Sequence, residues 1–196
     1  MDTASEIFKV AWRLFLERGY EATNIRNICK EVGVGLPTLY YHFQSKEALF
    51  LKLYDHCWSQ YLDNYESRQI IKMDLRADLK LFLMFKEDVE YLSQYEDDFK
   101  FNLRCTMFPP IELKETLYNK KMYYQRRRET IIRNIFEEAI EQKIIDKKNF
   151  EVYLKRHEMF VFNQIINKVF NKELLTNESL ESLWENFFKC KVGQLS

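Results

Sequence analysis

Several features that mark other protein classes are scarce in this sequence of 196 residues. It has only four glycines and three prolines. Alternating runs of β-branched residues are absent, which excludes a turn-rich β-sheet protein. No apolar stretch is long enough to span a membrane, and the polar, acidic start MDTASEIF does not have the form of a secretion signal. We therefore expect an all-α protein located in the cytoplasm, with no membrane partner.

Signs of enzyme or metal chemistry are missing as well. The cysteines Cys29, Cys57, Cys105 and Cys190 have neither disulfide-framework nor metal-ligand spacing, so we interpret them as reduced thiols. There is no P-loop, no G-x-G-x-x-G and no H-E-x-x-H. None of the three histidines has a partner at metal-ligand spacing. We predict no catalytic residue, no metal and no cofactor, and hence a protein that is not an enzyme.

The chain also lacks the excess positive charge that is typical of DNA-binding proteins. Its 30 lysines and arginines balance 30 acidic residues. A surface that attracts DNA must therefore come from segregation of charge, and Arg26, Lys30 and Lys46 all lie within residues 23–46. Because few phosphates would be neutralised, we expect weak non-specific binding with a moderate salt dependence.

The most informative stretch runs over residues 23–46, TNIRNICKEVGVGLPTLYYHFQSK. Its first part has apolar residues at helical spacing, with Thr23 as the predicted helix cap and Gly33 as the predicted end. A second helix opens at Pro37, because proline is tolerated in a first turn. Two short helices around a tight turn form a helix-turn-helix, which places its second helix in the major groove of DNA.

The segments FLERGYEATNIRNICKEVGV and GVGLPTLYYHFQSKEALF resemble the signature of the TetR family of bacterial transcriptional regulators, over residues 4–55. The resemblance implies a homodimeric, all-helical repressor with a variable C-terminal effector domain. It also implies which residues contact phosphates or position the second helix, and hydroxyl and cationic groups suit that role. These residues are Thr23, Thr38, Tyr40, His42 and Lys46.

Base edges would be read by a second, overlapping set of residues. An arginine can clamp guanine, and an apolar group can meet the methyl group of thymine. The set is Arg26, Gly35, Leu36, Thr38 and Tyr41. The family often has polar or basic residues where this chain has Gly35 and Leu36, so direct readout should be weaker here.

The full pattern predicts about nine helices in two domains. Residues 1–46 would form a three-helix helix-turn-helix DNA-binding domain, and residues 47–196 a larger helical domain for effector binding and dimerisation. A helix from residue 46 to about residue 67 is apolar on two sides and would connect them. The later helices are predicted over 73–93, 93–107, 112–145, 147–171 and 177–191. The first of these would turn Leu75, Leu79, Phe82, Leu83 and Val89 inward.

An effector cavity is predicted among the helices of the second domain, because pockets between helices are lined by aromatic residues with a few polar groups. Its candidate residues are Phe82, Phe85, Phe99, Phe101, Cys105, Phe108, Tyr123, Tyr124 and His157. The alternative is that these side chains simply fill the core.

The last two helices carry more apolar surface than one subunit needs, which indicates a subunit interface. Paired about a two-fold axis, they would form a four-helix bundle. The candidate interface residues are Phe150, Leu154, Val161, Ile165, Leu180, Trp184, Phe187 and Phe188. Filling of the monomer core is again the alternative.

Basic residues cluster between Lys120 and Arg133, and acidic residues between Glu87 and Asp98. We interpret both clusters as solvated faces with intramolecular ion pairs, the alternative being an anion site or a subunit contact on the basic run.

Two hypotheses for function remain. One is a dimeric DNA-binding transcriptional regulator, a repressor released from a pseudo-palindromic operator by a small, partly apolar effector. The other is a DNA-associated protein-interaction module whose C-terminal domain binds a protein partner and no small ligand.

Overall fold

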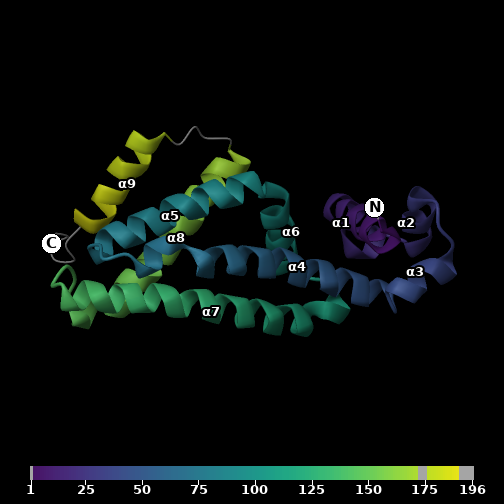
Figure 1. Cartoon of the computed structure of the whole chain (residues 1–196), viewed down its shortest axis with the longest axis horizontal. Helices are drawn as coiled ribbons and strands as arrows, with labels where there is room; N and C mark the ends of the chain where they lie inside the picture. The colour runs from purple at the N-terminus through teal and green to yellow at the C-terminus, as the bar shows by residue number, and fades with distance from the viewer. Residues whose placement is uncertain (1, 172–175, 190–196) are drawn as a thin grey trace. The chain divides into compact units, whose positions relative to one another are not determined.

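The computed structural model describes residues 2–171 and 176–189, without the side chains of residues 177 and 187–189. In this part of the chain there are nine α-helices, three short 3₁₀ turns and no strand, so the predicted all-α class is confirmed (Figure 1). The helices are α1 (Thr3–Ala22), α2 (Ile25–Val32), α3 (Leu36–His42), α4 (Lys46–Ser67), α5 (Ala77–Gln94), α6 (Glu96–Met107), α7 (Lys114–Glu141), α8 (Phe150–Phe170) and α9 (Asn177–Lys189). The 3₁₀ turns are η1 (Gln69–Lys72), η2 (Ile111–Leu113) and η3 (Lys147–Asn149). None of the described helices is both long and apolar enough to cross a membrane.

The helices pack into two compact units. The first contains residues 1–67 and 97–128, and the second contains residues 68–96 and 129–196. The helices α1 to α4 therefore share a unit with α6 and the first half of α7. This is a division by packing, and the functional boundary predicted at residue 46 stays a prediction.

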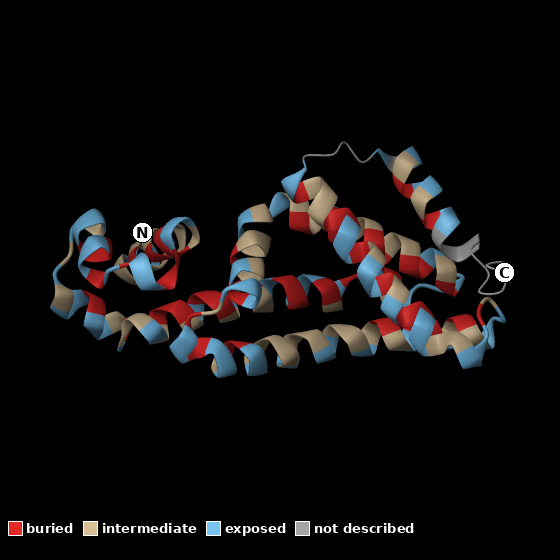
Figure 2. Ribbon diagram, turned by 180° about the vertical axis from the view of Figure 1, so that it is seen from behind, coloured by how far each residue is buried: buried red, intermediate tan, exposed pale blue. Residues whose placement is uncertain are grey.

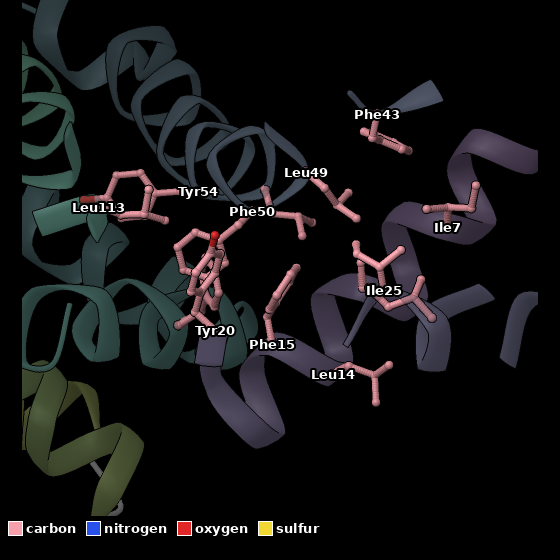
Figure 3. Packing of buried hydrophobic residues seen from close by; sticks show 14 of the residues in the cluster. Ile7, Leu14, Phe15, Tyr20, Ile25, Phe43, Leu49, Phe50, Tyr54 and Leu113 are labelled. Carbon is pink, nitrogen blue, oxygen red and sulfur yellow. The ribbon is translucent and has the colours of Figure 1, made fainter. Parts of the chain in front are cut away.

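The core of the first unit is centred on aromatic side chains from three helices. Phe50 of α4 meets Phe15 and Tyr20 of α1 edge to face, with ring centroids 5.0 and 4.9 Å apart (Figure 3). Phe101 of α6 meets the same Phe50 ring at 5.4 Å. Burying one such side chain contributes about 1.5–3 kcal/mol, so α6 is held in one core with α1 and α4 although it is distant in sequence.

The second unit has its own aromatic core. Phe85 of α5 stacks on Trp184 of α9, with centroids 5.5 Å apart. His157 of α8 meets Trp184 edge to face at 5.9 Å and Phe136 of α7 at 5.6 Å. Phe85 and His157 are almost completely buried, so these rings interlock within the unit.

Buried charges in the second unit are paired. The guanidinium of Arg68, 6% exposed, lies 2.9 Å from the carboxylate of Asp88, which is 1% exposed. It also donates to the carbonyl oxygen of Met84 at 3.0 Å. Lys80 is bonded to Glu138 at 2.6 Å. Such pairs are tolerated in a core only because each charge has its partner.

These pairs explain an error in the predicted orientation of α5. Leu79, predicted to face inward, is 43% exposed, whereas Leu81, Met84 and Phe85 are fully buried. The buried face also contains Lys80, which hydrophobicity alone assigns to solvent. A prediction from apolar residues alone therefore assigned the wrong side of α5 to the core.

The end of α1 is kinked at Gly19, whose φ of 83° and ψ of 175° lie outside the helical region. This backbone region is essentially restricted to glycine. Beside the kink, Nη1 of Arg104 from α6 donates to the carbonyl oxygen of Leu16 at 3.0 Å. The kink thus lets Tyr20 turn into the core and gives α6 a polar contact with α1.

Gly19→Ala should lower the free energy of unfolding by about 1–3 kcal/mol, the cost of a side chain in this backbone region. The added Cβ would also lie 2.6 Å from Nη2 of Arg104, which would have to move. Gly35→Ala is the control, because Gly35 has a φ of −81° and its nearest neighbour to an added Cβ is 3.5 Å away. Urea unfolding of both variants measures the difference, and equal midpoints would contradict the prediction.

Candidate nucleic-acid interface

The turn between α2 and α3 is built by local signals. Gly33 ends α2 in the left-handed conformation, with a φ of 79°, and its N–H donates to the carbonyl oxygen of Cys29 at 2.9 Å. Pro37 lies in the first turn of α3. The predicted helix-turn-helix is therefore present. The glycine that ends its first helix and the proline that opens its second helix are at the predicted positions.

The predicted cap of α2 is wrong by one residue. Asn24, and not Thr23, caps the helix, since its Oδ1 accepts from the N–H of Arg26 at 2.9 Å. Thr23 is 2% exposed, and its hydroxyl lies 2.7 Å from the carbonyl oxygen of Gly19 and 3.1 Å from that of Leu14. This hydroxyl fastens the start of α2 to α1 and does not face solvent, so we leave Thr23 out of the interface proposed below.

Helix α3 has a buried and an exposed side. Leu39 and Phe43 are 0% and 5% exposed and fix the helix to the core. Tyr41 is 86% exposed and Tyr40 48% exposed, and Thr38 is exposed with them. Figure 2 shows how buried and exposed stretches alternate along the helices of the chain. Two apolar residues four positions apart thus anchor one side of α3, and aromatic and hydroxyl groups lie on the other side. A recognition helix needs this arrangement.

The other predicted DNA contacts lie around this exposed side. Arg26 on α2 and Gly35 in the turn are exposed, and Leu36 and His42 are partly exposed. Lys46 begins α4, and its Nζ lies 4.2 Å from the centroid of the Tyr20 ring. Since α2 packs on α3, hydroxyl, aromatic and cationic groups are brought to one region.

Sequence reasoning missed one cation in this region. Lys52 of α4 is exposed, and its Nζ lies 5.3 Å from the centroid of the Phe43 ring at the end of α3. It adds a positive charge next to the recognition helix, which suits a phosphate contact. No local motif marks Lys52, because its position depends on how α4 packs against α3.

The predicted ligand residues are not gathered around one cavity. Phe82, Phe85 and His157 belong to the second unit, and the other six to the first. Phe85, Phe101 and His157 are at most 1% exposed within packed cores, whereas Phe108 and Tyr123 are 79% and 56% exposed. The space beside Phe101, Cys105 and Phe108 is only about 20 Å³, enough for one water.

Tyr124 has a structural place in the first unit. Its ring stacks on Trp58 with centroids 5.7 Å apart, and its hydroxyl donates to Oδ1 of Asp55 at 3.2 Å. Burial raises the pKa of Tyr124 to about 12, and the Asp55 carboxylate adds to the rise. Phe99, also predicted as a ligand residue, is partly buried on α6, and Cys105 lines a larger cavity in the first unit.

The predicted subunit-interface residues are mostly used inside the chain. Leu154, Val161, Ile165, Leu180 and Trp184 are buried, and Phe150 is partly buried. The side chains of Phe187 and Phe188 lie outside the described residues. Surplus apolar surface does exist on α8, on other residues: Val152, Met159, Phe162 and Phe170 are 47%, 73%, 50% and 47% exposed.

The basic run of α7 makes intramolecular ion pairs, in agreement with the favoured interpretation. Lys120 contacts Asp55 at 2.6 Å, Arg127 contacts Glu66 at 2.6 Å, and Arg133 contacts Glu129 and Glu151, each at 2.7 Å. The described cysteines Cys29, Cys57 and Cys105 are free and buried, and Cys190 lies outside the described residues. No cluster of potential metal ligands is found among the residues with described positions.

Comparison with known proteins agrees with this geometry. Residues 7–53 match the family described as bacterial regulatory proteins, tetR family. An HTH-type transcriptional regulator of Staphylococcus aureus (strain bovine RF122 / ET3-1) is 29% identical over 125 residues, which are 64% of this chain and 60% of that protein. The biofilm operon icaADBC HTH-type negative transcriptional regulator IcaR of Staphylococcus epidermidis is 34% identical over 58 residues, 30% of this chain and 31% of IcaR.

The fold is also that of a solved regulator. The crystal structure of AibR in complex with isovaleryl coenzyme A and operator DNA superposes with a TM-score of 0.68, covering 95% of this chain and 96% of AibR. The two sequences are 18% identical, so the likeness concerns the fold.

Thr23→Val should lower the free energy of unfolding by about 1–2 kcal/mol, because the isosteric side chain cannot donate to the buried carbonyl oxygens. Thr38→Val, at an exposed position of α3, is the control and should change stability by about 0.5 kcal/mol or less. Chemical unfolding checks both, and an unaffected Thr23→Val protein would show that the buried hydroxyl is dispensable.

Proposed function

This chain belongs to the TetR family of bacterial regulatory proteins through its residues 7–53, and we propose that it is a homodimeric, DNA-binding transcriptional repressor. The observation that carries the proposal is the division of α3 into a buried side, with Leu39 and Phe43, and an exposed side that includes Tyr41. A helix fixed in this way presents its outer side chains to a groove without rearrangement.

In the proposed complex α3 lies in the major groove. The residues that contact base edges are Arg26, Gly35, Leu36, Thr38 and Tyr41. The residues that contact phosphates are Tyr40, His42, Lys46 and the newly identified Lys52. All of these are exposed or partly exposed. Because the reading side is aromatic and hydroxylated, with few cations, specific contacts should contribute more than bulk charge.

A two-fold dimer is proposed because one recognition helix reads only a half-site, and two half-sites lie about one helical turn apart. The surface we assign to it is the exposed stripe of α8, formed by Val152, Met159, Phe162 and Phe170. These positions recur within a narrow arc of the helix, and adjacent exposed apolar side chains are typical of subunit contacts.

The proposed regulation is release from the operator by a small, partly apolar effector. AibR was crystallised with isovaleryl coenzyme A and operator DNA, which supports an effector of this general kind. We propose action on DNA in the cytoplasm, without a catalytic or membrane role. A protein-interaction module, the second hypothesis, would instead show DNA binding that no small molecule relieves.

Tyr41→Ala should weaken binding to the operator by about tenfold or more, since one base contact contributes about 1–3 kcal/mol. Stability should not change, because the ring is 86% exposed. The operator can be selected from random double-stranded DNA by the wild-type chain, and affinity measured by fluorescence anisotropy. Tyr123→Ala on α7, 56% exposed, is the control. Equal affinity of the Tyr41→Ala and wild-type chains would argue against α3 as the reading helix.

Met159→Glu combined with Phe162→Glu should convert the dimer to a monomer, because two carboxylates cannot be buried unpaired in an apolar interface. Sedimentation velocity measures the state, and affinity for the two-half-site operator should fall with it. Met73→Glu, at a site 47% exposed outside the stripe, should leave the dimer intact. A dimeric double variant would refute the assignment of this surface.

A further inference from the structure

Lys46 occupies a position that is unfavourable for a lysine unless a neighbouring group attracts its charge. It is the first residue of α4, and the positive end of a helix dipole repels an ammonium group. The backbone is fixed at this point, because Oγ of Ser45 accepts from the N–H of Ala48 at 2.9 Å. The backbone therefore cannot relieve the repulsion, and only rotation of the side chain could do so.

The aromatic ring of Tyr20 supplies the missing attraction. Nζ of Lys46 lies over this ring, 4.2 Å from its centroid. The face of an aromatic ring carries partial negative charge and attracts a cation within about 6 Å. The ring thus offsets the repulsion by the helix and keeps the ammonium group beside the start of α4.

The ring of Tyr20 is itself fixed in the core of the first unit. Tyr20 is 8% exposed, and the centroid of its ring lies 4.9 Å from that of Phe50 and 6.1 Å from that of Phe15 (Figure 3). The kink at Gly19 turns Tyr20 into this cluster. An ammonium group that is held by a fixed ring has lost conformational freedom before any DNA arrives.

The ammonium group of Lys46 keeps hydrogen-bond donors for another partner. Within the described part of the chain, no carboxylate forms an ion pair with Lys46. A lysine ammonium has three N–H donors, and the ring lies on one side of the group only. The donors on the other side can bond to a phosphate oxygen, so the ring and a phosphate can be contacted together.

Lys52, the other lysine of α4, is held less closely. Its Nζ lies 5.3 Å from the centroid of the Phe43 ring. Its side chain is exposed, whereas Lys46 is partly buried. The attraction between a cation and a ring is weaker at exposed sites. Of the two lysines, Lys46 is therefore the one whose position depends more on its aromatic neighbour.

We propose that Tyr20 is a positioning residue for DNA binding, because its ring holds the ammonium group of Lys46 in place for a phosphate contact. Ordering a long side chain costs free energy on binding, and the ring removes part of that cost in the free chain. Tyr20 acts through Lys46 and does not contact DNA itself. The contact between the ring and Lys46 is independent of the proposed function, whereas the gain in DNA affinity rests on it.

The role of the ring face is tested with Tyr20→Phe and with the same substitution carrying one, two or three fluorine atoms on the ring. Fluorine withdraws negative charge from the ring face with little change in size, so the attraction for a cation weakens while the core stays filled. Operator affinity, measured by fluorescence anisotropy, should fall stepwise along the series by about two- to tenfold in total, the cost of ordering one long side chain. In a Lys46→Gln background, the members of the series should have equal affinities.

Two further measurements separate this role from packing. The same fluorination at Phe101, whose ring centroid lies 5.4 Å from that of Phe50 in the same core, should not change operator affinity. Lys46→Gln should reduce the slope of log affinity against log salt concentration by about one. The fluorinated series should keep the wild-type slope, because the charge of Lys46 is retained. Constant affinity along the series, or an equal fall in the Lys46→Gln background, overturns the positioning role.

The contact between Tyr20 and Lys46 is tested without DNA by nuclear magnetic resonance. Protons above an aromatic ring resonate upfield, so the Cε protons of Lys46 should be shifted upfield from those of the exposed Lys30. The shift should disappear in Tyr20→Leu, and thermal unfolding verifies that this variant is folded. Absence of the shift in the wild-type chain, or its persistence in Tyr20→Leu, overturns the contact. If the shift is present but the wild-type chain binds no double-stranded DNA, the proposed function and the positioning role both fail, while the contact stands.

Discussion

The packing of the end of α1 against α4 and α6 is the interaction on which the first unit depends. The kink at Gly19 allows Tyr20 to turn inward, where its ring meets Phe50, and Phe101 closes the cluster from α6. The start of α2 is tied to the same place by the hydroxyl of Thr23. Helices α2 and α3 have few residues and could not bury enough surface alone, so this cluster is what holds the recognition helix in position.

The sequence was most informative where short-range chemistry decides the structure. Gly33 can adopt the left-handed conformation that ends α2, and Pro37 has a fixed φ that suits the first turn of α3. Leu39 and Phe43 then mark the side of α3 that faces the core. The helix-turn-helix could therefore be predicted residue by residue. Its cap was misassigned because Thr23 and Asn24 are both good capping residues, and only the carbonyl groups of α1 decide which one turns inward.

Elements that depend on distant partners could not be predicted in the same detail. The orientation of α5 was missed because Lys80 is buried beside Glu138, a pairing invisible to a hydrophobic pattern. The aromatic residues assigned to a ligand include Phe85 and Phe101, which instead fill two separate cores. On α8, the apolar residues with the strongest pattern are the buried ones, so the exposed stripe around Met159 became apparent only after packing was known.

The buried pair of Arg68 and Asp88 has an evolutionary consequence. Loss of Arg68 alone would leave the buried Asp88 carboxylate without this partner, and loss of Asp88 alone would leave the buried guanidinium with the partly exposed Glu87, 3.1 Å from its Nε. Related chains should therefore exchange the two together, either for another ion pair or for two apolar side chains of matching size. The residue types at these two positions should therefore vary together among related sequences. This covariation should persist even where the rest of the sequence has diverged.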